Sequence, residues 1–91
     1  MKMLIHEKDL KTLNDTVIPM LCENYKCRFS AEFYQLKIRF DKLSELINKY
    51  YEGTLDFTLN CPITLLEDQH RTMSSYLHIL KFRADIEGID L

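Results

Sequence analysis

The strongest constraint on this chain is an apolar seam that runs through residues 29–51. Its positions alternate in steps of four and three residues, which is the a/d spacing of a helix that packs against another helix. The seam comprises Phe29, Phe33, Leu36, Phe40, Leu43, Ile47 and Tyr50. We therefore predict a long α-helix over residues 29–51 that requires a helical partner.

A second seam further along the chain supplies that partner. It has the same alternating spacing and comprises Leu66, His70, Met73, Leu77, Leu80 and Ala84. Pro62 is favoured at the first helical position, and the capping pattern from Thr64 to Glu67 allows a start one or two residues later. The helix is expected to end near Gly88. Because the connection of residues 54–60 is short, the two helices should form an antiparallel hairpin.

The ends of the first hairpin helix also carry local signals. Ser30 is a good N-cap, because its hydroxyl can accept a hydrogen bond from a first-turn N–H. Gly53 can adopt the left-handed conformation that stops a helix. Apolar and polar residues alternate from Leu55 to Leu59, but a single strand has no sheet to join, so a folded-back loop is expected.

The N-terminal part predicts a shorter helical segment. Residues 1–5 form an apolar start that is either extended or frayed, and residues 6–25 have a helical apolar stripe. Either a kinked helix or two short helices are expected, with the break near residues 14–16 and Pro19 in the first turn of the second piece. This segment, residues 1–28, should pack on the hairpin of residues 29–91, so that the whole chain is a single all-α domain.

Size, charge and cysteine content narrow the functional classes. A chain of 91 residues with a net charge of −2 has no general basic face for nucleic acid. It has neither the roughly 20 apolar residues of a membrane span nor a signal peptide, so a cytoplasmic protein is expected. Its three cysteines, Cys22, Cys27 and Cys61, are predicted to be free thiols, since their spacing does not suit zinc. No metal and no cofactor are expected.

More apolar surface is present than one seam explains. Ala31, Tyr34 and Ile38 lie away from the seam of the first helix, and Leu65, Tyr76, Ile79 and Ile86 form a flank on the second. The N-terminal segment can cover one patch. The other patch predicts a homo-oligomer, because exposed apolar patches of this extent are unusual on monomers.

Residues 25–91 resemble a family of short helical proteins of tailed phages. The residues that carry the resemblance are Tyr25-Lys26-Cys27-Arg28-Phe29, the run Ala31–Leu43, Cys61-Pro62, Leu65-Leu66, Gln69, Met73, Tyr76-Leu77, Leu80, Arg83-Ala84 and Ile86–Ile89. Cys27 replaces the acidic residue that is usual there. The family is related to a crAss-like phage protein and has no assigned activity, so the resemblance implies a phage accessory gene rather than a mechanism.

Arg83 is the most informative candidate for a binding residue. A guanidinium beside an apolar flank requires an anion, so it either pairs with Glu32, Glu45 or Glu87 or recognises a phosphate or carboxylate. Tyr76 and Gln69 lie seven and fourteen residues before it, which is about two and four helical turns. Together these three side chains offer a cation, an aromatic ring and an amide, which suit a nucleotide.

Other candidates have equally plain structural alternatives. Lys37 and Arg39 flank the first seam and either lie along the helix edge or bind a ligand. Tyr34 and Lys37, one turn apart, are candidates for completing a pocket at a subunit junction. His70 is either a hydrogen-bonded core histidine that fixes register or a contact to a ligand.

No motif for catalysis is present, so a non-enzymatic protein is expected. The first hypothesis is a phage counter-defence protein that sequesters a host nucleotide signal, such as a cyclic dinucleotide or a cyclic ADP-ribose-type molecule. Its ligand-binding candidates are Tyr34, Lys37, Arg39, Gln69, Tyr76 and Arg83. One alternative is a protein that inhibits a host defence enzyme by binding it, and another is a structural or regulatory assembly module.

Overall fold

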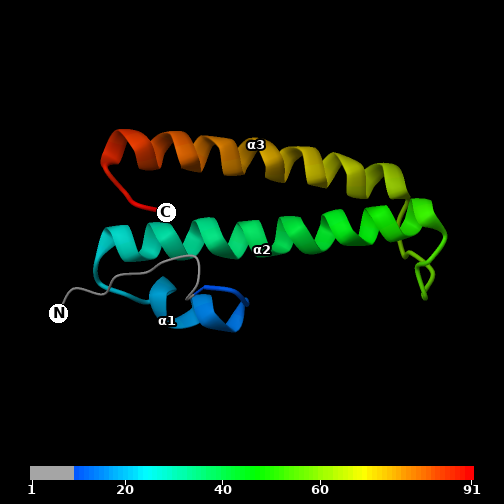
Figure 1. Cartoon of the computed structure of the whole chain (residues 1–91), viewed down its shortest axis with the longest axis horizontal. Helices are drawn as coiled ribbons and strands as arrows, with labels where there is room; N and C mark the ends of the chain where they lie inside the picture. Colours follow the sequence, from blue (N-terminus) through cyan, green and yellow to red (C-terminus); the bar gives the residue numbers. More distant parts are fainter. Residues whose placement is uncertain (1–9) are drawn as a thin grey trace.

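The computed structural model describes residues 10–91, so the predictions for residues 1–9 lie outside it. The element order is a 3₁₀ turn η2 (Asn14–Thr16), a short helix α1 (Val17–Met20) and the two long helices α2 (Tyr25–Glu52) and α3 (Ile63–Glu87). Figure 1 shows α2 and α3 side by side and antiparallel, with α1 against α2 on the side away from α3. The all-helical hairpin is therefore confirmed for this part of the chain.

Helix α2 begins earlier than predicted, and Ser30 is not its N-cap. The cap is Asn24, whose side chain accepts a hydrogen bond from the backbone N–H of Lys26 at 2.8 Å. Asn caps a helix as well as Ser does. The earlier start also adds a turn that buries Cys27 and Phe29. Ser30 lies inside the helix and is itself buried.

Both long helices end on a glycine in the left-handed conformation. Gly53 has φ 75° and Gly88 has φ 70°. After Gly53 the N–H of Thr54 donates to the Lys49 carbonyl at 3.0 Å, and after Gly88 the N–H of Ile89 donates to the Ala84 carbonyl at 2.8 Å. This is the Schellman arrangement, which satisfies the last carbonyls and reverses the chain. The predicted stops at Gly53 and Gly88 are confirmed.

The N-terminal segment is less helical than predicted. Residues 10–13 are not helical, and the stretch expected to be a break, residues 14–16, is the 3₁₀ turn that leads into α1. The side chain of Thr16 is fully buried and donates to the Leu13 carbonyl at 2.6 Å. The interruption comes instead between Met20 and Tyr25. Pro19 is buried within α1, whose four residues are too few to require the N–H that proline lacks.

The core lies at one end of the hairpin. Leu10, Phe29, Phe33, Tyr34, Leu80, Ala84 and Ile89 form its buried cluster, with Leu36, Leu77 and Leu91 packed beside it. Towards the connecting loop the hairpin is only two helices thick. There the predicted seam residues Phe40, Leu43, Ile47 and Leu66 are only half-buried.

The two apolar faces outside the seams differ in how far they are buried. Ala31 and Tyr34 are 0% and 3% exposed, because Leu10 and the N-terminal elements pack against α2. The flank on α3 remains open, with Leu65, Tyr76, Ile79 and Ile86 between 42% and 77% exposed. Phe82, 67% exposed, extends this face beyond the residues predicted for it. We call Leu65, Tyr76, Ile79, Phe82 and Ile86 the α3 stripe.

Candidate functional site

The predicted binding residues are divided between two edges of the α2–α3 pair. One edge, which we call the Arg83 edge, carries Arg83 and Tyr76 of α3 against residues of α2. The other, which we call the Tyr34 edge, carries Tyr34 and Lys37 of α2 against the last turns of α3 and the tail that follows. The structure therefore does not unite the six predicted residues into one site.

Arg83 is already paired within the chain. Its Nε donates to the Glu87 carboxylate at 3.2 Å, and one terminal nitrogen donates to the Tyr25 hydroxyl at 2.8 Å. The guanidinium carbon lies 5.0 Å from the centre of the Phe29 ring, a favourable cation–π distance. The alternative of an ion pair with a glutamate is confirmed, with Glu87 as the partner. An anionic ligand here would have to displace that carboxylate.

Tyr76 is held in a similar way on the same edge. Its hydroxyl donates to the Glu32 carboxylate of α2. This hydrogen bond raises the pKa of the Tyr76 phenol above its ordinary value, because losing the proton would place two negative charges together. Tyr76 therefore ties α3 to α2 and is not an unengaged stacking ring.

Arg39 and Gln69 are exposed and belong to the same edge nearer the loop. Arg39 follows Glu32 by seven residues on α2, and Gln69 precedes Tyr76 by seven residues on α3. Seven residues are about two helical turns, so each lies on the same side of its helix as that neighbour. Arg39 follows Tyr25 by 14 residues, which is about 20 Å along an α-helix. Because Arg83 contacts Tyr25, Arg39 and Arg83 are too far apart to share one small ligand.

A pocket of about 420 Å³ lies at the Tyr34 edge. Its lining combines apolar residues with charged ones from three parts of the chain: Phe33, Tyr34 and Lys37 of α2, Lys81, Ala84 and Asp85 of α3, and Ile89, Asp90 and Leu91 of the tail. The left-handed turn at Gly88 sends that tail back towards α2, as Figure 1 shows. The buried side chain of Ile89 fastens the tail to the core.

A second hollow of about 210 Å³ adjoins this pocket. It shares Tyr34 and Lys37 with the pocket and is otherwise lined by Leu10, Lys11, Ile38 and Asp41. Tyr34 is 3% exposed and forms part of the wall of both spaces. The predicted pair of Tyr34 and Lys37 is therefore the junction of one continuous concave surface along α2.

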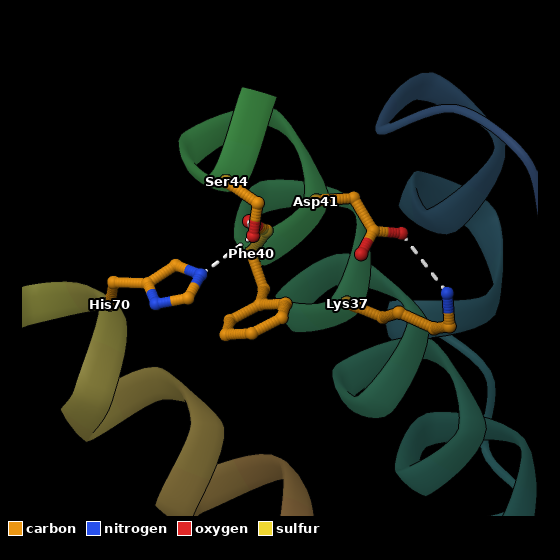
Figure 2. Close-up of polar contacts among 5 residues, drawn as sticks. All are labelled: Lys37, Phe40, Asp41, Ser44 and His70. Atoms are coloured by element: carbon orange, nitrogen blue, oxygen red, sulfur yellow. Dashed lines mark hydrogen bonds and ion pairs between the residues drawn. The ribbon is translucent and has the colours of Figure 1, made fainter. Parts of the chain in front are cut away.

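Lys37 is held at that junction by an ion pair. Its Nζ lies 3.0 Å from Asp41 one turn later, and Figure 2 shows the two side chains on the side of α2 away from α3. The side chains of Lys37 and Asp41 remain 37% and 58% exposed, so the pair is solvated and weak. An anionic group in the pocket can therefore compete with Asp41 for the ammonium group.

His70 contacts α2 inside the hairpin rather than either pocket. Its ring stacks on Phe40 with centroids 4.3 Å apart, and its Nε2 lies 2.6 Å from the Ser44 hydroxyl (Figure 2). The Ser44 hydroxyl also lies 3.0 Å from the Phe40 carbonyl oxygen, and the His70 tautomer decides whether Nε2 donates to Ser44 or accepts from it. The prediction of a hydrogen-bonded seam histidine is confirmed.

Sequence reasoning missed the α3 side of the pocket. Lys81 and Asp85 are one turn apart, and both lie next to seam residues, Leu80 and Ala84. That phase places them on the flank opposite Arg83. The signal that could have drawn attention to them is Gly88, whose left-handed turn brings the tail beside them.

The described residues form neither a metal-binding cluster nor a membrane-spanning helix. Residues 10–91 contain no group of three or more His, Cys, Asp or Glu side chains arranged to hold a metal ion. None of the helices in that range combines the length and the apolar character that a membrane span requires.

Comparison with known proteins places the chain in a family. The profile of the family described as Sequestin matches residues 23–86, which include α2, the loop and almost all of α3. No curated protein and no solved structure matches the chain. The family name is consistent with a sequestering role. Because the match spans more than half of the 91 residues, the chain belongs to the Sequestin family.

Proposed function

We propose that this protein is a non-enzymatic phage accessory protein that binds and sequesters a host immune nucleotide signal in the cytoplasm of the infected cell. The ligand is a cyclic dinucleotide or a cyclic ADP-ribose-type molecule. The family name supports sequestration, and the resemblance to short tailed-phage proteins supports the counter-defence setting. The observation that carries the proposal is the pocket at the Tyr34 edge.

The chemistry of the pocket suits a ribonucleotide. Lys37 and Lys81 supply two ammonium groups for phosphate oxygens. Asp85 and Asp90 supply carboxylates, which are good acceptors for ribose hydroxyls. The pocket volume of about 420 Å³ lies within the roughly 300–1,000 Å³ of small-molecule sites. A mixed lining of this kind favours a ligand that has both phosphates and sugar hydroxyls over a simple anion.

The Arg83 edge has a supporting role in this proposal. Arg83 and Glu87 bond to Tyr25 of α2, and Tyr76 bonds to Glu32 of α2. These bonds hold α2 and α3 in register. That register sets the distance between Lys37 on one helix and Lys81 on the other. Gln69 and Arg39 lie away from the pocket and are assigned no contact to the ligand.

Melting of the protein with a panel of nucleotides tests the proposal. A cyclic dinucleotide or cyclic ADP-ribose-type ligand should raise the Tm, because a ligand that binds only the folded state stabilises it. Heat denaturation should then release the nucleotide unchanged in mass. Failure of every nucleotide in the panel to shift the Tm would contradict the proposal.

Lysine variants locate the site. Lys37→Ala and Lys81→Ala should each weaken nucleotide binding by about tenfold or more, which corresponds to about 1.4 kcal/mol. Lys42→Ala is the matched control, because Lys42 is also exposed on α2 but does not line the pocket. Equal losses in all three variants would indicate a general charge effect and not a site.

The exposed α3 stripe supports a second function. It suits either a protein-binding inhibitor of a host defence enzyme or an assembly module, since an apolar helix face is a common protein-docking surface. We assign it to a second copy of this chain. The stripe runs from Leu65 to Ile86, about 30 Å of helix, and the half-buried seam beside the loop is open to the same kind of packing.

A further inference from the structure

Two cysteines lie together where the turn after α1 meets α2. Cys22 is half-buried on the turn, whereas Cys27, in the first turn of α2, is 5% exposed. The backbone N–H of Cys22 donates to the Pro19 carbonyl oxygen at 3.2 Å. The Cys27 thiol donates to the same oxygen at 3.7 Å. The two cysteines therefore meet at one backbone carbonyl.

The backbone around this pair is fixed by side chains. Arg28 donates to the carbonyl oxygens of Cys22 and Glu23 at 2.8 and 2.7 Å. Asn24, two residues after Cys22, caps α2. The two cysteines thus lie at the N-terminus of a long helix, where the free N–H groups favour negative charge.

The two thiols differ in acidity in a way that suits a reactive pair. The hydrogen bond from Cys27, followed by that from the Asn24 N–H, lowers the pKa of Cys22. Burial, together with that same hydrogen bond, raises the pKa of Cys27 to about 11. The thiolate therefore forms on the more accessible sulfur, and the buried sulfur keeps its proton. This division is typical of an attacking and a resolving cysteine.

We propose that Cys22 and Cys27 form a redox modification site that reacts with low-molecular-weight disulfides such as glutathione disulfide. The Cys22 thiolate attacks one sulfur of the small disulfide, forms a mixed disulfide and releases one thiolate. Cys27 then loses its proton and attacks the Cys22 sulfur, which releases the second small thiol. The protein dithiol is oxidised by two electrons, and the small disulfide is reduced to two thiols.

The product is a disulfide between the turn and the first turn of α2. It replaces the contact of the Cys27 thiol with the Pro19 carbonyl by a covalent link across the same junction. The site is separate from the pocket at the Tyr34 edge, whose lining includes neither cysteine. Nucleotide binding and thiol oxidation are therefore measured independently.

Treatment of the full chain with glutathione disulfide at neutral pH tests this site. The three thiols should fall to one, with a loss of about 2 Da and a Cys22–Cys27 link in peptide mapping. Cys61→Ser is the matched control and should form the same link, since Cys61 lies in the loop just before α3, away from the pair. Cys22→Ser should form no internal disulfide.

Cys27→Ser provides the trapping variant. It removes the resolving thiol, so one glutathione should remain on Cys22 and should be retained longer than on wild type. If this variant does not fold, a quenched time course on wild type should show glutathione on Cys22 before the internal link appears. Equal labelling of Cys22 and Cys61 without an internal disulfide would overturn the proposal.

Discussion

The Glu87 carboxylate is hydrogen-bonded to two other residues of the Arg83 edge. It accepts a hydrogen bond from the Tyr25 hydroxyl at 2.7 Å and another from Arg83 at 3.2 Å. The Tyr25 hydrogen bond, and then Arg83, hold the pKa of Glu87 below its ordinary value of 4.5. The ionised form is thus favoured in the folded state, and this preference links folding to pH.

We predict a pH-dependent difference between wild type and Glu87→Gln. A carboxyl with a lowered folded-state pKa stabilises the protein above its unfolded pKa, and that stabilisation is lost as pH falls through the folded value. Wild type should therefore have the higher Tm at neutral pH. The difference should shrink as pH is lowered from about 5 to about 3, as measured by circular dichroism.

Asp15 does not affect the Tm difference between wild type and Glu87→Gln. Hydrogen bonds from Thr12 lower the pKa of its carboxyl as well, so it also contributes to acid unfolding. Because Asp15 is present in both proteins, its effect cancels in the difference between them. A Tm difference that stays constant down to pH 3 would mean that Glu87 contributes through packing and not through its charge.

At the scale of elements, the two left-handed glycines offer a controlled comparison. Gly53 and Gly88 have nearly the same φ, and a Cβ at either one would meet no atom within 4 Å. Alanine should therefore cost about 1 kcal/mol at each position through backbone strain alone. Only Gly88 directs a tail that lines the pocket.

We predict that Gly53→Ala and Gly88→Ala lower the Tm by similar amounts but differ in binding. Gly88→Ala should weaken nucleotide binding because it disturbs the turn that places Ile89 and Asp90 in the pocket wall. Gly53→Ala should leave the affinity unchanged. The two variants are compared by titration with the nucleotide that the melting experiment identifies. Equal affinities would show that the tail does not contribute to nucleotide binding.

The elements that were predicted well are those with a repeating pattern. The two apolar seams identified the pairing of α2 with α3, and Gly53 and Gly88 marked the ends. The start of α2 was misplaced because Ser30 and Asn24 have similar capping chemistry, and the choice between them depends on burial of Cys27 and Phe29. The capping preference of one residue contains no information about this tertiary packing.

The lining of the pocket followed from the sequence only in part, for a related reason. Tyr34 and Lys37 lie one turn apart on one helix, so their neighbouring positions follow from the spacing alone. Lys81, Asp85 and Asp90 come from elsewhere in the chain, and they meet Lys37 only after the hairpin closes and the tail turns back. Arg83 was correctly seen to need an anion, and the structure supplies Glu87 from the same helix.

At the scale of the whole molecule, burial differs between the two ends of the hairpin. The core is confined to the end of the hairpin that the N-terminal elements cover. The rest of the hairpin has a half-buried seam and, on α3, the exposed stripe. A two-fold axis through that stripe would pack each copy against the same face of the other, which is the commonest form of protein dimer.

We predict that the protein is a dimer in solution and that Phe82→Asp dissociates it. Because a two-fold interface contains each substitution twice, two carboxylates would be brought into one apolar contact. The dimer Kd should rise by about tenfold or more, equivalent to about 1.4 kcal/mol. Size-exclusion chromatography with light scattering over a range of micromolar concentrations measures the change.

Phe57→Asp is the matched control for this dimer. Phe57 is also an exposed aromatic residue, but it lies in the loop between α2 and α3. Its substitution should leave the mass of the assembly unchanged. A wild-type protein that is monomeric at every concentration would refute the dimer. If that monomer also captured a host defence protein, and Phe82→Asp prevented capture, the α3 stripe would belong to an inhibitor instead.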